Sequence, residues 1–157
     1  MKLGSVLIAG GMVVALASAC ASVKPLYKGE RRAREEVAVL KLATTGAITN
    51  INGLALEGRA YELLPGRYEV NFRLYFRGEL INPAAKGQRY RRDCTTEFSA
   101  EAGHLYEISE GKPRYMTGNR KEAGREMYVF DAPVYLADVD SKGMAIKATK
   151  ADCRYRK

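Results

Sequence analysis

The feature that most constrains the fold is a strict alternation of apolar and polar side chains between residues 68 and 76. The apolar set is Tyr68, Val70, Phe72, Leu74 and Phe76, and the residues between them are Glu69, Asn71, Arg73 and Tyr75. Successive side chains of a β-strand point to opposite faces of a sheet, so one face of this segment would be buried and the other would meet water. The alternation therefore predicts a half-buried β-strand.

Short apolar runs separated by turn residues continue this pattern from residue 36 onward. Further strands are predicted over residues 37–42, 47–51, part of 54–64, 90–98, 104–108, 127–130 and 134–139, with a last strand that ends near Cys153. Asn52-Gly53 and Pro65-Gly66 are pairs that favour tight turns. Turn signals at intervals of eight to twelve residues are typical of a sandwich. We therefore expect an all-β fold, a single antiparallel β-sandwich over residues 36–157.

Two stretches interrupt the strand pattern, and we expect both to be exposed loops. Residues 77–89 contain Gly78, Pro83 and Gly87, and residues 110–125 are basic, rich in glycine and interrupted by Pro113. Long loops on a rigid sandwich commonly carry binding. They are the first candidates for a contact surface.

The N-terminal residues differ in composition from the rest of the chain. Lys2 is the only charge before Lys24, and small residues at positions 17–19 precede Cys20. A basic start, an apolar stretch and small residues before a cleavage point are typical of a signal peptide. The uncharged run is also long enough for a retained membrane anchor, although Gly10-Gly11 at its centre disfavours that alternative. Ordinary cleavage after residue 19 would leave a free thiol at Cys20.

Residues 17–20, Ala-Ser-Ala-Cys, resemble the lipobox of bacterial lipoproteins. The match lies at Ala19 and Cys20, whereas the family usually has Leu at the position of Ala17. The resemblance implies lipidation of Cys20, cleavage of residues 1–19, and a lipid anchor and flexible tether over residues 20–35. Ala21 in place of Asp implies an outer-membrane lipoprotein on the periplasmic face. Two or three acyl chains hold a small domain almost permanently, so the membrane would be reached through the N-terminal lipid.

The remaining two cysteines, Cys94 and Cys153, suit one disulfide. An exported protein meets an oxidising compartment, and two thiols are what one bridge requires. Such a bridge would attach the C-terminal segment to the middle of the fold. Two buried free thiols are the alternative. Together with the solitary His104 these cysteines offer too few ligands for a metal, and no cofactor is expected.

Residues 48–70 and 98–106 resemble a second bacterial family. Ile51-Asn52-Gly53 is followed by the run Leu63-Leu64-Pro65-Gly66-Arg67-Tyr68-Glu69-Val70, and residues 98–106 read FSAEAGHLY. These residues are similar to the hairpin, turn and strand of PEGA-type envelope modules and to a stretch found in many small lipoproteins. The resemblance implies a transthyretin-like or immunoglobulin-like sandwich. This chain differs from the family pattern at Leu64, where the family commonly has a second proline.

No residue pattern identifies catalysis. Any imidazole-based general acid or base would depend on His104, whose Ala-Gly-His-Leu-Tyr context favours a structural role. The segment starting at Asp138 begins like a calcium loop, but Lys142 stands where an oxygen ligand is needed. We therefore expect a protein that is not an enzyme, with an envelope hydrolase as the weakest alternative.

The charge of the chain points to anionic partners. Removal of 19 of the 157 residues leaves 138, and loss of Lys2 lowers the formal net charge from +8 to +7. An exported protein meets little nucleic acid, so the basic surplus indicates either an ordinary solvated surface or contact with phosphate or carboxylate groups of envelope polymers or with another envelope protein. The candidate contact residues are Arg89, Arg91, Arg92, Arg114, Arg120, Lys121 and Arg125.

The sequence thus predicts a non-catalytic scaffold or interaction module. The alternative is a ligand-binding or inhibitor-type lipoprotein. A pocket lined by Tyr or Phe would favour the ligand, a flat basic face would favour a polymer or partner, and two close carboxylates in a cleft would favour an enzyme. The mixed charges within residues 24–34 favour a solvated linker, and contact of the basic residues with anionic lipid headgroups is the alternative.

Overall fold

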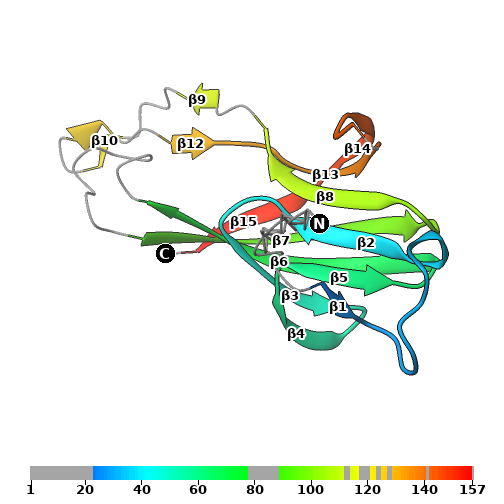
Figure 1. Ribbon diagram of the computed structural model, residues 1–157. Coiled ribbons are helices and arrows are strands. Elements are labelled where there is room, and N and C mark those ends of the chain that lie inside the picture. The colour runs from blue at the N-terminus through cyan, green and yellow to red at the C-terminus, as the bar shows by residue number, and fades with distance from the viewer. Residues whose placement is uncertain are drawn as a thin grey trace, which may run out of the picture.

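The computed structural model describes residues 23–77, 89–111, 114–116, 121–122, 125–126, 129–140 and 142–156, and nearly all of its elements are strands (Figure 1). The strands are β1 (Lys24–Pro25), β2 (Ala38–Leu42), β3 (Gly46–Ile51), β4 (Leu54–Gly58), β5 (Ala60–Leu63), β6 (Gly66–Arg77), β7 (Arg89–Ala100), β8 (Leu105–Glu110), β9 (Arg114–Met116), β10 (Lys121–Glu122), β11 (Arg125–Glu126), β12 (Val129–Asp131), β13 (Val134–Val139), β14 (Ala145–Lys150) and β15 (Asp152–Arg156). A short 3-10 helix, η1, covers Arg34–Glu36.

Two large sheets form the expected all-β sandwich. One sheet has six strands in the order β1-β5-β2-β8-β13-β14, and the other has five in the order β15-β7-β6-β3-β4. Pairing is antiparallel except for β1 with β5 and β2 with β8, which are parallel. The chain passes from one sheet to the other several times, so each sheet contains strands from both halves of the sequence.

The long pair β6–β7 is the centre of the five-stranded sheet. Its register runs without interruption from Gly66 opposite Ala100 to Arg77 opposite Arg89. The predicted alternation is confirmed, because Val70, Phe72 and Leu74 are buried while the residues between them are more exposed. These apolar side chains pack against residues of the six-stranded sheet, among them Leu40, Tyr61, Ile108 and Val134.

The turn predicted at Asn52-Gly53 joins β3 to β4. Both residues have positive φ, 49° at Asn52 and 82° at Gly53, which is the conformation this dipeptide tolerates. The side chain of Asn50 accepts a hydrogen bond from the Gly53 backbone nitrogen at 2.8 Å. Local chemistry was therefore sufficient to predict this hairpin.

The predicted last strand is two strands in different sheets. β14 pairs with β13 in the six-stranded sheet, and β15 pairs with β7 in the other. Between them Ala151 is buried, and its backbone nitrogen donates to the carbonyl oxygen of Val134 at 2.8 Å. The chain therefore turns a corner at Ala151, a change of sheet that two consecutive extended segments do not reveal.

The expectation of a loop over residues 110–125 is wrong for its described part, which contains short strands. β9 pairs with β12, and β10 pairs with β11, so the chain between β8 and β13 leaves the sandwich as an excursion of paired strands (Figure 1). Short strands in this stretch carry no alternation long enough to identify them. The other predicted loop is described only at its ends, because residues 78–88 lie outside the described residues.

The expectation of a flexible tether up to residue 35 also needs correction. From Lys24 onward the segment lies on the domain, with β1 added to the edge of β5 and Leu26 packed against the core. Polar residues without a periodic pattern suggested a linker, but pairing with a strand edge uses the backbone and requires no such pattern. The predicted signal peptide and Cys20 lie outside the described residues.

Candidate functional site

The outer face of the five-stranded sheet carries a group of polar side chains. Asn71 and Arg73 of β6 lie on the opposite face from the buried Phe72, and they stand opposite Thr95 and Asp93 of β7 in the register. The strict alternation of both strands therefore places these four side chains together on the solvent side.

β15 and β3 extend this group on either side. Asp152 and Arg154 are exposed and lie opposite Thr95 and Asp93, and Thr49 lies on β3 beyond Asn71. Together with the four side chains of β6 and β7 they line an open hollow of about 450 Å³. Four strands thus meet at one polar site, which we call the sheet hollow.

Guanidinium groups surround Asp93 at one end of the sheet hollow. The Arg73 Nε atom lies 3.2 Å from Asp93 Oδ1, and Arg91 Nη2 lies 3.3 Å from Asp93 Oδ2. Between 31% and 39% of each of these three side chains is exposed, so all three are partly accessible to solvent. A hydrogen bond with Tyr75, and then one with Asp93, raises the pKa of Arg73, so the guanidinium stays charged.

Arg154 adds a third guanidinium to this end. It is exposed, it stands opposite Asp93, and it forms no ion pair with any residue that the structure describes. Asp93 is therefore paired with two arginines, and a third arginine lies opposite it in the register, with Asp152 as the other acid of the lining. Planar guanidinium groups bind phosphate and carboxylate through paired hydrogen bonds, which suits this end to an anionic group.

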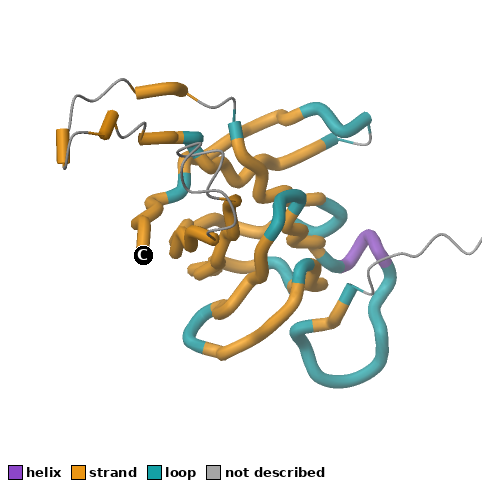
Figure 2. Tube along the Cα trace, turned by 90° about the vertical axis from the view of Figure 1, so that its left-hand side faces the viewer, coloured by secondary structure: helices purple, strands orange, loops and turns teal. Residues whose placement is uncertain are grey.

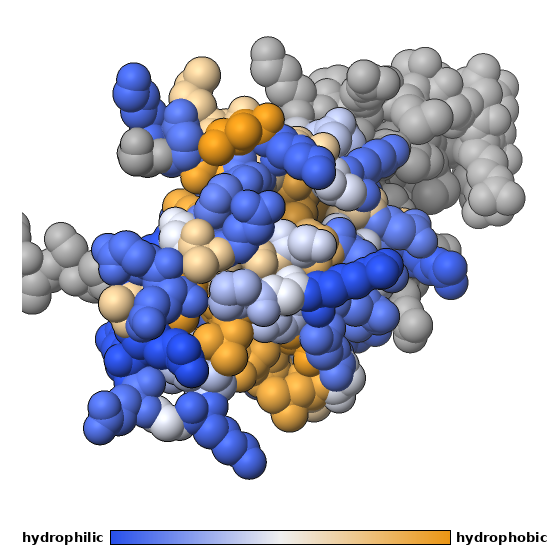
Figure 3. Space-filling view, turned by 90° about the vertical axis from the view of Figure 1, so that its right-hand side faces the viewer, coloured by the Kyte–Doolittle hydropathy of each residue, from blue (hydrophilic) through white to orange (hydrophobic). Residues whose placement is uncertain are grey.

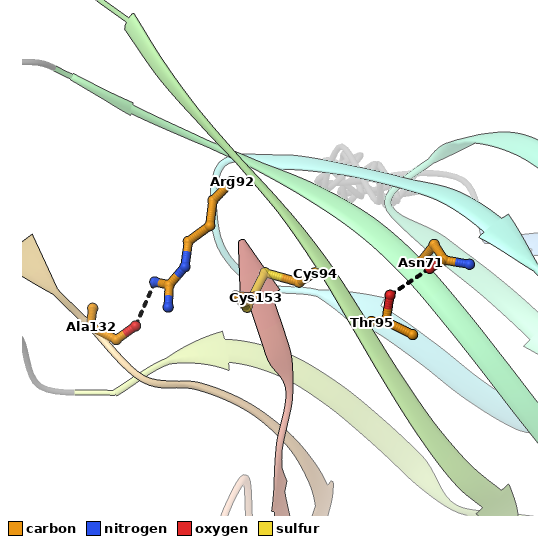
Figure 4. Close-up of a disulfide and its surroundings, with 6 residues drawn as sticks. All are labelled: Asn71, Arg92, Cys94, Thr95, Ala132 and Cys153. Atoms are coloured by element: carbon orange, nitrogen blue, oxygen red, sulfur yellow. Dashed lines mark hydrogen bonds between the residues drawn. A yellow bond between two sulfur atoms is a disulfide. The ribbon is translucent and has the colours of Figure 1, made fainter. Parts of the chain in front are cut away.

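Neutral hydrogen-bonding groups form the other end of the sheet hollow. The Thr95 hydroxyl donates to Asn71 Oδ1 at 2.6 Å (Figure 4), and the Thr49 hydroxyl donates to the Asn71 carbonyl oxygen at 3.2 Å. Tyr75, which is 43% exposed, lies on the same face two residues beyond Arg73, next to the guanidinium end and not among these neutral groups. Amide, hydroxyl and aromatic groups next to guanidinium could contact a polar polymer over several units.

A disulfide between Cys94 and Cys153 lies directly beneath this site (Figure 4). The two residues are register partners on β7 and β15, and Cys94 is buried on the core side. The bridge is the pairing that the cysteine count favoured. It holds β15 beside β7, so the neighbouring Asp152 and Arg154 stay against Thr95 and Asp93.

The structure separates the basic residues that the sequence had grouped. Arg89 is exposed at the start of β7, and Arg91 lies on the outer face beside the sheet hollow. Arg92 is 4% exposed and points into the sandwich, where its Nη1 donates to the Ala132 carbonyl oxygen at 2.6 Å (Figure 4). Its assignment to a contact surface is wrong, because adjacent residues of a strand cannot face the same side.

The other basic candidates belong to the excursion between β8 and β13. Arg114, Lys121 and Arg125 lie on β9, β10 and β11, with side chains that the structure does not describe, and Arg120 lies outside the described residues. The sheet hollow is thus built largely from residues that sequence reasoning did not select. The sequence pattern that could have identified them is the polar half of the alternation in β6, which places Asn71, Arg73 and Tyr75 on one face.

A second, smaller hollow of about 220 Å³ is lined in part by Tyr106, Asp138 and Lys147, and His104 hydrogen-bonds to the Asp138 of this lining. The His104 Nδ1 atom is 2.9 Å from Asp138 Oδ2, and its Nε2 is 3.8 Å from Glu101 Oε2. A carboxylate can orient an imidazole so that the imidazole acts as a general base toward a hydroxyl or thiol nucleophile. Among the described residues, no hydroxyl or thiol hydrogen-bonds to His104 Nε2. The His104–Asp138 pair connects β13 to the turn before β8, which is a structural role.

Neither a metal nor a membrane helix is indicated by the described part of the chain. It contains no group of three or more His, Cys, Asp or Glu side chains placed to hold a metal ion. No helix within the same residues is long and apolar enough to span a bilayer. Figure 3 shows mostly hydrophilic side chains, with hydrophobic atoms visible between them, at the end of the sandwich that it faces.

No protein-family model matches the chain, and neither a curated protein nor a solved structure matches it. The fold and the two hollows therefore carry the functional argument, and the resemblances to lipoprotein signals and PEGA-type modules stay predictions. The fold defines a class, a β-sandwich with one polar, arginine-rich sheet face.

Proposed function

We propose that this chain is a lipid-anchored lipoprotein of the outer membrane that works on the periplasmic side as a non-catalytic interaction module. Its sheet hollow binds anionic groups of an envelope polymer. The observation that carries the proposal is the group of three arginines at one end of the hollow: Arg73 and Arg91 pair with Asp93, and the exposed Arg154 lies opposite Asp93 in the register. A small domain with a basic, rigid sheet face needs no chemistry of its own to bind such a polymer.

A polymer is favoured over a small ligand by the shape and lining of the site. Small-molecule pockets are concave and mostly apolar, whereas the sheet hollow is open and its lining is dominated by charged and amide side chains. Tyr75 at its margin is one exposed aromatic ring, which suits contact along a chain better than enclosure of a single molecule.

The binding test compares two arginine variants of the purified lipoprotein. Arg91→Gln with Arg154→Gln should weaken binding to lipopolysaccharide or to peptidoglycan fragments about tenfold, because two guanidinium contacts are lost. The target group is identified with the unaltered protein and modified ligands. Weaker binding to dephosphorylated lipopolysaccharide would identify phosphate, and weaker binding to amidated peptidoglycan would identify carboxylate. Binding should also fall as salt rises.

The matched control is Arg67→Gln. Arg67 lies on β6, is exposed and pairs with Glu97 at 2.7 Å, away from the lining of the sheet hollow. The Arg67→Gln substitution removes one positive charge from the same sheet but none from the sheet hollow. The affinity of this variant should therefore stay near that of the unaltered protein. Equal binding by the unaltered protein and the double variant would overturn the proposal.

A further inference from the structure

The segment that follows the predicted lipid site is fixed to the sandwich by its backbone. β1 pairs with β5, with Lys24 opposite Tyr61 and Pro25 opposite Glu62. The next residue, Leu26, donates its backbone N–H to the Glu62 carbonyl oxygen at 2.9 Å and packs against the core. From Lys24 onward the chain therefore belongs to the six-stranded sheet.

Side chains reinforce this attachment at Glu62. The Glu62 carboxylate accepts hydrogen bonds from the Tyr27 hydroxyl at 2.9 Å and from Arg31 Nε and Nη2 at 3.2 and 2.7 Å. The carboxylate side chain is 8% exposed, and it is covered by the segment it binds. Hydrogen bonds to a charged carboxylate are among the stronger ones available to a protein, and here three of them hold one segment.

A second attachment lies further along the same segment. Arg34 of η1 donates from Nη1 to the Val37 carbonyl oxygen at 2.9 Å and from Nη2 to the His104 carbonyl oxygen at 3.1 Å. Residues 24–34 are thus tied to β5 at one end and to the turn before β8 at the other. They cannot lengthen as a tether without breaking these contacts.

The free length between lipid and sandwich is consequently short. Four residue steps separate Cys20 from Lys24, and a fully extended chain spans at most about 3.6 Å per residue, or roughly 14 Å in total. The polar headgroup layer is itself several ångströms deep. A lipid on Cys20 would therefore keep β1 within reach of the headgroups at all times.

The position of β1 identifies which side of the sandwich would face the bilayer. Lys24 Nζ lies 3.5 Å from the carbonyl oxygen of Glu57 on β4, so the two edge strands are neighbours. Figures 1 and 2 show the β3–β4 hairpin and the loop after β1 projecting on one side of the molecule, with the β13–β14 hairpin on the opposite side. We call the first side the β1–β4 edge.

The charge on the loop after β1 suits an anionic surface. Lys24, Lys28 and Arg32 are exposed, with Glu30 as the acidic residue among them, and Arg31 is already paired with Glu62. Each basic residue near an anionic leaflet contributes about 1 kcal/mol of attraction. Attraction of this size orients a domain whose lipid already holds it at the surface.

We infer that the sandwich lies directly on the anionic phospholipid surface that holds its lipid, with the β1–β4 edge against the headgroups and β14 facing away. The inference rests on the lipid anchor of the proposed function and is independent of polymer binding. On this inference residues 24–34, held by Glu62, fix the orientation of the domain on the membrane and do not act as a flexible spacer. We call this segment the strap.

The test measures the depth of two labels on the lipoprotein in vesicles that contain phosphatidylglycerol. Lys28→Cys lies on the β1–β4 edge and Met144→Cys lies on the β13–β14 hairpin, and each carries one fluorophore. With Cys20 lipidated and the other cysteines bridged, the new thiol is the reactive one. A headgroup quencher should quench the label at position 28 several-fold more than the label at position 144. Equal quenching at both positions would overturn the inference.

Glu62→Gln with Arg31→Gln should release the strap and abolish the difference between the labels. A second releasing variant, Tyr27→Phe with Arg31→Gln, removes the hydrogen-bond donors of Glu62 and leaves Glu62 itself unchanged. It replaces the first variant if that variant does not fold. Glu97→Gln, which breaks the exposed pair with Arg67, is the matched control and should keep the difference. A difference that survives both releasing variants would show that the strap does not orient the domain.

Failure of the lipid anchor itself is distinguished by palmitate labelling of the unaltered protein beside Cys20→Ser. Equal labelling would overturn the anchor. In that case Cys20 is a thiol to which a maleimide lipid can be coupled, and an azide-bearing amino acid introduced at position 28 or 144 carries the dye. This protein repeats the depth measurement. Unequal quenching then supports the geometry, and equal quenching refutes it.

Discussion

At the scale of single residues, the buried carboxylate of Glu62 is stabilised by hydrogen bonds from the segment that covers it. Glu62 lies in β5, where all four residues are buried, because one face meets the core and the N-terminal segment covers the other. A carboxylate in such a place needs partners, and Arg31 and Tyr27 supply them. A lone Glu within the apolar run AYELL was the available signal for a covered strand face.

The Glu62 contacts predict that attachment of residues 24–34 depends on pH. The hydrogen bond from Arg31, which outweighs the effect of burial, lowers the pKa of Glu62 from its usual value. A group with a lowered pKa in the folded state stabilises that state above its usual range, and the stabilisation is lost as pH falls through the lowered value. Hydrogen exchange of the Leu26 amide should therefore accelerate, relative to core amides, once the pH falls below the usual Glu range.

Glu62→Gln provides the control for this pH dependence. The variant lacks the titrating group, so the ratio of Leu26 exchange to core exchange should be high and should not change over the same pH range. A steep acid response in the variant would assign the effect to another carboxyl group.

At the scale of elements, the success of sequence reasoning depended on how local the determining interactions are. The β6 alternation and the Asn52-Gly53 turn were correctly predicted because each depends on a few neighbouring residues. β1 and the β14–β15 corner were missed because each depends on pairing with strands distant in sequence. The site followed the same rule: the polar face of β6 was predictable, but its pairing with β15 was not.

The two faces of β6 should respond very differently to truncation. Phe72 is 1% exposed within the core, so Phe72→Ala should lower the free energy of unfolding by about 3–5 kcal/mol. Tyr75, on the same strand, is 43% exposed, and Tyr75→Ala should change it by less than about 1 kcal/mol. Denaturant unfolding measures both. A similar cost at both positions would contradict the assignment of faces.

At the scale of the whole molecule, the disulfide closes a large part of the chain into a loop. Cys94 and Cys153 are separated by 59 residues, and that loop contains β8, the excursion, β13 and the corner at Ala151. Because β15 is the edge strand beyond β7, the bridge also prevents the C-terminal strand from separating. Its effect therefore extends beyond the two strands that it joins.

Removal of the bridge should destabilise the whole sandwich. A closed loop of this size restricts the unfolded chain enough to stabilise the fold by about 4 kcal/mol. Cys94→Ala with Cys153→Ala should lower the free energy of unfolding by roughly that amount in denaturant titrations, with the strand content kept by circular dichroism in the absence of denaturant. Unchanged stability would show that the bridge adds little to strand pairing.

The buried Arg92 has a mechanical consequence for the excursion between β8 and β13. At the root of that excursion the Gly111 N–H donates to the Pro133 carbonyl oxygen at 2.7 Å, and Arg92 grips the neighbouring Ala132 carbonyl oxygen from the opposite sheet. The excursion leaves from β8 and β13, which pair in the six-stranded sheet, and Arg92 connects its base to β7, which is paired with β6 and bridged to β15. A displacement at the base of the excursion would therefore be opposed by both sheets.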